Sequence, residues 1–337
     1  MAVAERPRLL FGKYFGSNRV TNPQLAKLGI VTKHDDFSVA ENIERKFGMV
    51  WRPEAREFED ESFMGIQSGR GVVELIHDEI KYVLYSMSYP RKNDPLKDFE
   101  ITYDLTPQFD RYYHAACSGS VLALTEMKDM EQEARGRRFV LVASERYRNV
   151  MEDPRKDPSR SMFMFGDGAS MMSGVYGEDF RVLHYRNFDA FTEEERNTLR
   201  MPIDYSNVKE GSRVVPIPVS ESGKFEMDGG GVLRAMQPVL TGLIPQTVEE
   251  AGFKPGDIDW VVTHQASLQM LERTAKRMPD YKDKFIYNLE GGNLSSATVT
   301  LAMETGINIG LITRGMRLVL VGFGAGLFVS VAVIELG

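Results

Sequence analysis

The chain has 337 residues, 42% of them apolar and 26% charged, a composition typical of a globular protein with two domains or one large double-layered unit. Its net charge of −7 argues against a nucleic-acid binder, and a single cysteine excludes an internal disulfide, which predicts a cytoplasmic protein. Neither an apolar signal core nor an apolar run of about 18 residues occurs, so no secretion and no membrane span are expected.

Short apolar runs alternate with helical stretches along most of the chain. Continuous apolar strands between helices are typical of α/β folds whose sheets are covered on both faces. One helix is predicted over 121–127 and another over 233–251, the second ended by Gly252. Charged residues and prolines predict a surface loop over 152–160. The predicted strands, in chain order, are 80–84, 110–113, 139–143, 162–165, 260–262, 318–321 and 328–334.

The same order of strand, turn and helix occurs twice. Cys117 lies at the turn of the first copy, and residues 291–293 hold that place in the second. A duplicated α/β unit would bring the two turns together if its halves packed about a pseudo-twofold axis. We therefore expect an N-terminal half over 1–175, a C-terminal half over 216–337, and an insertion or connecting segment over 176–215.

Cys117 stands among small residues, in Ala115-Ala116-Cys117-Ser118-Gly119. Small neighbours leave the sulfur accessible, and the N–H groups of a following helix favour the thiolate, which is the nucleophilic form. A cysteine is also a good small core residue, so this pattern alone leaves both interpretations open.

Three further features follow predicted strands and have two interpretations each. His264 ends a buried strand, where it serves either chemistry or structure. Asn293 follows two glycines, and its side chain either takes part in chemistry or caps the next helix. The glycine-rich turn over 322–326 either presents backbone N–H groups to an oxyanion or is a tight strand connection.

The order of Cys117, His264, Asn293 and a glycine-rich turn resembles the thiolase superfamily, most closely the β-ketoacyl-acyl-carrier-protein synthase III (ketosynthase III) family. The resemblance extends over 110–337. It implies an α/β fold of five α/β/α/β/α layers, built from two pseudo-symmetric halves. The stretches that carry it are His114-Ala115-Ala116-Cys117-Ser118-Gly119, Phe165-Gly166-Asp167-Gly168-Ala169, Phe225-Glu226-Met227-Asp228-Gly229, His264-Gln265-Ala266, Gly292-Asn293-Leu294-Ser295-Ser296-Ala297 and Gly322-Phe323-Gly324-Ala325-Gly326.

The resemblance implies an acyltransferase in which Cys117 takes an acyl group from a CoA or acyl-carrier-protein thioester. The backbone N–H groups of Cys117 and Ala325 would hold the oxyanion. A malonyl thioester would then lose carbon dioxide, while His264 and Asn293 donate hydrogen bonds to the enolate. This chemistry needs no cofactor beyond the phosphopantetheine thioesters of the substrates, and no metal-ligand cluster stands out in the sequence.

The sequence departs from the family pattern where substrates dock. Phe37 stands where a tryptophan often stacks on the CoA adenine, although Trp51 could substitute for it. Ser267 stands where the family usually has asparagine, and Gln269 where a basic residue is common. These differences favour a specialised fatty-acid or polyketide enzyme. The resemblance also implies a homodimer, which we expect to pair through the strand over 139–143.

Other activities remain open at this point. The acyl group could pass from Cys117 to an amine, alcohol or thiol without a new carbon–carbon bond. Two acyl chains could be joined without decarboxylation, but we find no carboxylate base near 88–95. A non-catalytic partner subunit of a heterodimer is disfavoured, since such subunits typically lose the cysteine. Met171, Met172, Phe180, Phe188 and Phe191 could line an acyl tunnel or simply pack in the core.

Overall fold

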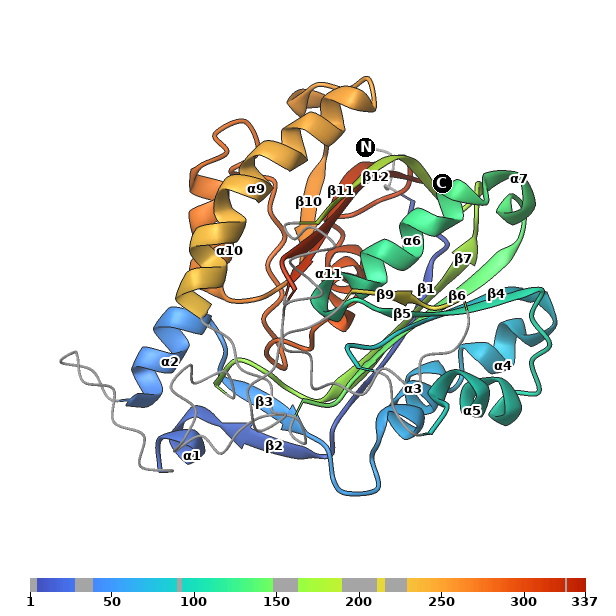
Figure 1. Cartoon of the computed structure of the whole chain (residues 1–337), viewed down its shortest axis with the longest axis horizontal. Helices are drawn as coiled ribbons and strands as arrows, with labels where there is room; N and C mark the ends of the chain where they lie inside the picture. Colours follow the sequence, from blue (N-terminus) through green and yellow to red (C-terminus); the bar gives the residue numbers. More distant parts are fainter. Residues whose placement is uncertain are drawn as a thin grey trace.

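The computed structural model describes residues 5–27, 39–89, 93–147, 163–189, 211–215, 229–324 and 326–337. In this part of the chain, helices, a sheet, central helices, a second sheet and further helices follow one another as five layers (Figure 1). The α/β/α/β/α arrangement expected from the sequence is therefore confirmed. No helix in the described ranges has the length and apolar character that crossing a membrane requires.

The first sheet has six strands in the order β1-β7-β6-β4-β5-β9. Its parallel centre consists of β6 (Arg138–Glu145), β4 (Ile80–Ser86) and β5 (Phe109–His114). Antiparallel β7 (Gly168–Val175) and β1 (Leu10–Phe15) extend it on one side, and the short β9 (Arg213–Val214) pairs with β5 on the other. β4 and β6 are almost entirely buried because helices cover both faces, which explains their continuous apolar runs.

The second sheet has four strands in the order β10-β11-β12-β8. β10 (Trp260–Thr263) and β11 (Arg317–Gly324) run parallel. β12 (Phe328–Leu336) and β8 (Phe180–Asp189) continue the sheet in antiparallel pairs. The C-terminal strand β12 thus lies inside the sheet rather than at its edge.

The two sheets repeat one topology. The strands β8, β12, β11 and β10 follow the order and relative directions of β1, β7, β6 and β4. A parallel bridge between Val261 and Phe285 continues the second sheet where β5 continues the first. Within 176–215, expected as an insertion or connection, Phe180–Asp189 is therefore the counterpart of β1 and pairs along β12. The division into halves at 175 and 216 stays a prediction.

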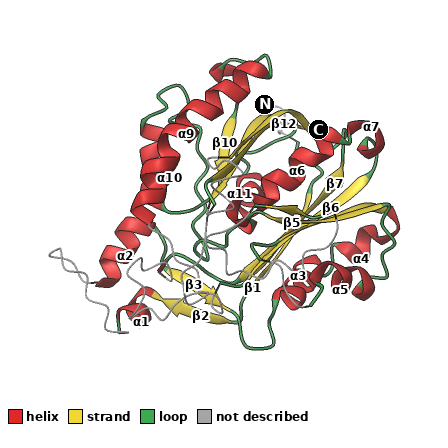
Figure 2. Ribbon diagram, viewed as in Figure 1, coloured by secondary structure: helices red, strands yellow, loops and turns green. Residues whose placement is uncertain are grey.

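Two helices separate the sheets and begin at the two predicted turns (Figure 2). They are α6 (Gly119–Asp129) and α11 (Ala297–Asn308), and both are buried along most of their length. On the outside, α3 (Glu61–Gly69) and α5 (Pro95–Thr102) cover the first sheet, while α9 (Gly229–Glu250) and α10 (Leu268–Lys276) cover the second.

Shorter elements complete the described chain. Gly252, with a φ of 84°, follows α9 as the sequence predicts. The remaining bounds are β2 (Asn18–Thr21), β3 (Trp51–Glu54), α1 (Asn22–Ala26), α2 (Val39–Phe47), α4 (Val73–Ile76), α7 (Glu131–Ala134), and the 3₁₀ turns η1 (His77–Glu79), η2 (Ala116–Ser118) and η5 (Pro255–Asp257).

Two predictions about strands need correction. Residues 163–165 form a turn instead of a strand, because Met164 O and Gly166 N bind the backbone of Asn293 rather than a neighbouring strand. Pairing of two subunits through 139–143 is also wrong, since β6 lies between β7 and β4 and both of its edges are used. The loop predicted over 152–160 lies outside the described residues.

Candidate active site

Cys117 occupies a tight turn between β5 and α6. The chain passes through Ala116 with a positive φ of 43° before it enters the helix. This conformation is strained for a residue with a Cβ, and such strain is typical of functional turns. A Cβ added to Gly324 would lie 2.8 Å from Cβ and 3.1 Å from Sγ of Cys117, so glycine is what allows β11 to approach the sulfur.

Ser295 connects Cys117 with Asn293. Its hydroxyl donates to Cys117 Sγ at 3.4 Å, and its N–H donates to Asn293 Oδ1 at 2.8 Å. Left-handed φ angles at Gly291, Gly292 and Ser295 shape this turn. Because Oδ1 accepts from Ser295, the NH₂ of Asn293 is the group that can donate to a ligand. The two predicted turns therefore meet.

His264 joins the cluster from the end of β10. Its Nδ1 lies 2.7 Å from Thr298 Oγ1, and this hydroxyl lies 2.9 Å from the carbonyl oxygen of Ser295. The imidazole is buried and stands edge-on to Phe323, with ring centroids 5.2 Å apart. Burial lowers the pKa of His264 to about 3, so the ring is neutral at pH 7.

The single proton of Thr298 determines what neutral His264 can do. If the hydroxyl donates to Nδ1, the ring proton sits on Nε2 and can be donated to a substrate oxygen. If the hydroxyl donates to Ser295 O, Nδ1 carries the proton and Nε2 becomes a base. The N–H of Gln265 donates to the same hydroxyl at 3.2 Å in either case.

Two hydroxyls that the sequence analysis missed lie beside the thiol. Ser88 Oγ is 2.7 Å from Tyr147 OH and 3.0 Å from Ser295 Oγ, and Tyr147 OH donates to Ser295 Oγ at 2.9 Å. The Tyr147 ring stacks on Phe165 with centroids 4.3 Å apart. Ser88 and Tyr147 each follow a predicted parallel strand, and the carboxyl ends of parallel strands meet at one edge of a sheet. This position was the signal that could have found them.

A buried carboxyl group was missed as well. Glu145 accepts from Ser88 N at 3.0 Å, Ser296 Oγ at 2.6 Å and Ser296 N at 3.4 Å. Burial raises the pKa of Glu145 to about 7, against the lowering effect of these hydrogen bonds. Burial also raises the pKa of Cys117 to about 12, and the charge of Glu145 adds to that rise. The expectation that the helix terminus favours the thiolate is therefore wrong here, because burial outweighs it.

The other residues predicted for the site are not part of the cluster around Cys117 that the structure describes. Ala325 and Phe37 lie outside the described residues. Trp51 is half-buried in β3, with the Arg19 guanidinium 4.7 Å from its ring centroid. The Ser267 hydroxyl caps α10 by accepting from Met270 N, so it serves the helix.

The side chains considered for an acyl tunnel mostly pack in the core. Met171, Met172 and Phe180 are almost fully buried, in the hydrophobic clusters around the first sheet and the central helices. Phe188 is 38% exposed near the end of β8, and Phe191 lies outside the described residues. Core packing accounts for the three buried side chains.

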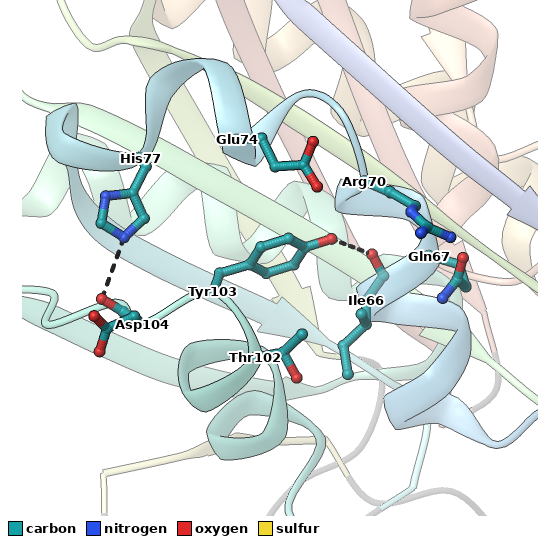
Figure 3. Close-up of a pocket in the computed structure, with 8 residues that line it drawn as sticks. All are labelled: Ile66, Gln67, Arg70, Glu74, His77, Thr102, Tyr103 and Asp104. Atoms are coloured by element: carbon teal, nitrogen blue, oxygen red, sulfur yellow. Dashed lines mark hydrogen bonds between the residues drawn. The ribbon is translucent and has the colours of Figure 1, made fainter.

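An open cavity of about 570 Å³ lies away from this cluster, on the outer helix layer of the first sheet. Residues of α3, η1 and the end of α5 line it, and Figure 3 shows Tyr103 donating to the carbonyl of Ile66 at 2.6 Å. None of the residues predicted for catalysis lines this cavity. Within the described ranges, no three His, Cys, Asp or Glu side chains gather where a metal ion could bind.

Comparison with known proteins agrees with this geometry. The family profile described as 3-oxoacyl-[acyl-carrier-protein (ACP)] synthase III matches residues 113–182, and its C-terminal counterpart matches residues 248–336. The first match contains Cys117, and the second contains His264 and Asn293. The β-ketoacyl-[acyl-carrier-protein] synthase III of Neisseria meningitidis strain Z2491 is 27% identical over 324 residues, which are 94% of each chain.

Solved structures share the fold. The 3-oxoacyl-[acyl-carrier-protein] synthase III from Aquifex aeolicus VF5 has a TM-score of 0.76 at 20% identity, over 96% of this chain and 98% of that one. The priming β-ketosynthase of the R1128 polyketide biosynthetic pathway has a TM-score of 0.74 at 24% identity, over 100% and 98%.

The shared fold and the two profile matches indicate an enzyme of the acyltransferase class. The chain is similar to the β-ketoacyl-acyl-carrier-protein synthase III family of condensing enzymes, and the two profile matches together contain Cys117, His264 and Asn293.

Proposed function

We propose that this protein makes a carbon–carbon bond by decarboxylative Claisen condensation, with an acyl group on Cys117 and a malonyl thioester as the second substrate. The observation that supports it most is that Ser295 contacts both Cys117 and Asn293 while Thr298 holds His264 beside them. A nucleophile and two neutral donors then face one small volume, which is the arrangement that the two half-reactions require.

In the first half-reaction, the Cys117 thiolate attacks the carbonyl carbon of an acyl-CoA or acyl-carrier thioester, and the carrier leaves as a thiol once it takes up a proton. The backbone N–H groups of Cys117 and Ala325 hold the oxyanion. The close packing of Gly324 on Cys117 supports this assignment, because it brings the backbone of the glycine-rich turn toward the sulfur.

In the second half-reaction, the malonyl thioester loses carbon dioxide and the electron pair remains as an enolate. The NH₂ of Asn293 and Nε2–H of His264 donate to the enolate oxygen, where negative charge develops. This role requires that Thr298 donates to Nδ1 of His264. The enolate carbon then attacks acyl-Cys117, and the thiolate leaves.

The substrates arrive as thioesters, so no bound cofactor is needed. Trp51, with Arg19 on its ring, is the described candidate for contact with a CoA adenine, and Phe37 and Ser267 are the weaker candidates. A role in specialised fatty-acid or polyketide metabolism is supported by the departures at these positions. We further propose a homodimer that pairs through β5, since among the described residues β9 covers only Tyr113 and His114 on the outer edge of that strand.

Intact-mass measurement tests this proposal directly. The protein is incubated with acyl-CoA and acyl-carrier thioesters of several lengths, and Cys117→Ala is the control. One acyl mass on the wild type and none on the variant supports acyl-Cys117. No acyl adduct with any donor would reject it.

A second candidate is transfer of the acyl group to an amine or alcohol. It is favoured by the alternative state of Thr298, whose hydroxyl can donate to Ser295 O. Nε2 of His264 is then a base that removes the proton of the acceptor as it attacks acyl-Cys117. Carbon dioxide release from a malonyl thioester separates the two candidates.

A further inference from the structure

The hydroxyls of Ser88, Tyr147 and Ser295 have no part in the half-reactions described above. All three side chains are buried, each lies within 3.0 Å of the other two, and the group ends at the Cys117 sulfur. Tyr147 also has a hydrogen bond with Cys117. The three hydroxyls therefore have more hydrogen-bonding contacts than protons, which limits the directions in which they can donate.

One arrangement uses every proton. Ser88 donates to Tyr147 at 2.7 Å, Tyr147 donates to Ser295 at 2.9 Å, and Ser295 donates to Cys117 Sγ at 3.4 Å. Each donor in such a chain polarises the next, which strengthens the last hydrogen bond. The stacking of Tyr147 on Phe165, whose backbone bridges Asn293, holds the phenol in place.

We propose that Tyr147 and Ser88 are positioning residues for the nucleophile. Tyr147 contacts Cys117 directly as well as through Ser295, and Ser88 holds both hydroxyls, so that their protons are directed at the sulfur and stabilise its thiolate. The inference rests on the proposed role of Cys117. Glu145 is a nearby acid and His264 is neutral, so the charges around the sulfur do not favour a thiolate. Hydrogen bonds from hydroxyl groups can supply that stabilisation instead.

The variant Tyr147→Phe removes one hydroxyl and keeps the stacked ring. Alkylation of Cys117 by iodoacetamide should slow about tenfold, the lower end for loss of a hydrogen bond to a charged group. Ser295→Ala should have a similar or larger effect, and Ser88→Ala a smaller one. Tyr113→Phe is the matched control, since that buried phenol has no hydrogen-bond partner among the described residues and lies outside the group.

A second readout separates lost hydrogen bonding from lost access. Cys117 is the only thiol, so the infrared S–H stretching band at neutral pH belongs to it alone. In Tyr147→Phe, Ser295 Oγ loses one of its two neighbouring hydroxyl donors and keeps only Ser88, so it gains a free lone pair that can accept from S–H, which should move the band to lower frequency. Tyr113→Phe should leave the band where it is.

The inference would be overturned if Tyr147→Phe were alkylated at the wild-type rate and its S–H band did not move. Slower alkylation with an unchanged band would also overturn it, because only access would then have changed. If the wild type takes no acyl group but the band still moves, the proposed function fails and the inference stands. If the wild type takes acyl groups and the band does not move, the inference alone fails.

Discussion

The hydroxyl of Ser295 lies 3.4 Å from the sulfur of Cys117, although the two residues come from opposite halves of the molecule. The backbone N–H of the same serine donates to Asn293, and its carbonyl oxygen can accept a hydrogen bond from the hydroxyl of Thr298. Ser295 therefore connects the nucleophile with both predicted enolate donors. A substitution at one of these residues should therefore have measurable effects on the others.

Asn293→Ala should separate the two half-reactions. Acyl loading of Cys117 should persist, because backbone donors serve that step. Decarboxylation of a malonyl thioester should fall by about a hundredfold or more, the usual effect of losing one preorganised donor. His264→Ala should behave similarly. Carbon dioxide release is measured beside acyl-enzyme mass, and equal losses in both steps would contradict the division of roles.

Gly324→Ala should impair acyl loading by displacing Cys117. The new Cβ would lie 2.8 Å from Cβ of the cysteine, closer than carbon atoms can pack, so strand or turn must shift. A destabilisation of about 1–3 kcal/mol is expected from such overpacking. Gly242→Ala is the matched control, because a Cβ there meets open space. Urea unfolding and acyl loading are measured, and a fully active, fully stable Gly324→Ala would refute the close approach.

Glu145→Gln should change how stability depends on pH. Burial raises the pKa of Glu145 from its ordinary 4.5 to about 7 in the folded protein, so its contribution to stability is complete below pH 4.5 and is lost as the pH rises through 7. The wild type should lose about 3 kcal/mol relative to Glu145→Gln across this window. Urea unfolding at both ends measures the difference, and parallel pH profiles would contradict the raised pKa.

The same substitution should make the thiol more reactive. Removing the charge of Glu145 lowers the pKa of Cys117, which that charge helps to raise. Iodoacetamide should therefore label Glu145→Gln faster than the wild type near neutral pH. Equal labelling rates would show that the carboxyl group has no influence on the sulfur.

The proposed homodimer can be tested by sedimentation at micromolar concentration. β6 is an interior strand, whereas only Tyr113 and His114 of β5 are paired with a described strand on its outer edge. A stable monomer would contradict the proposal.

The strand–turn–helix repeat could be predicted from local patterns in the sequence, whereas the five layers followed from the family resemblance. Apolar runs mark β6, β11 and β12, and small residues mark the turns of Cys117 and Asn293. The pairing of β6 was mispredicted because strand order is decided by contacts between distant segments. Ser88, Tyr147 and Glu145 were missed for the same reason, since their neighbours are known only once the strands are assembled.

Condensation is best tested by one assay on the wild type, in which acyl-Cys117 and carbon dioxide release from a malonyl thioester are followed together. We expect a single acyl adduct, absent in Cys117→Ala, followed by carbon dioxide release and a β-ketoacyl thioester product. An enzyme that loads acyl groups but never releases carbon dioxide would contradict condensation, and transfer to an amine or alcohol would take its place.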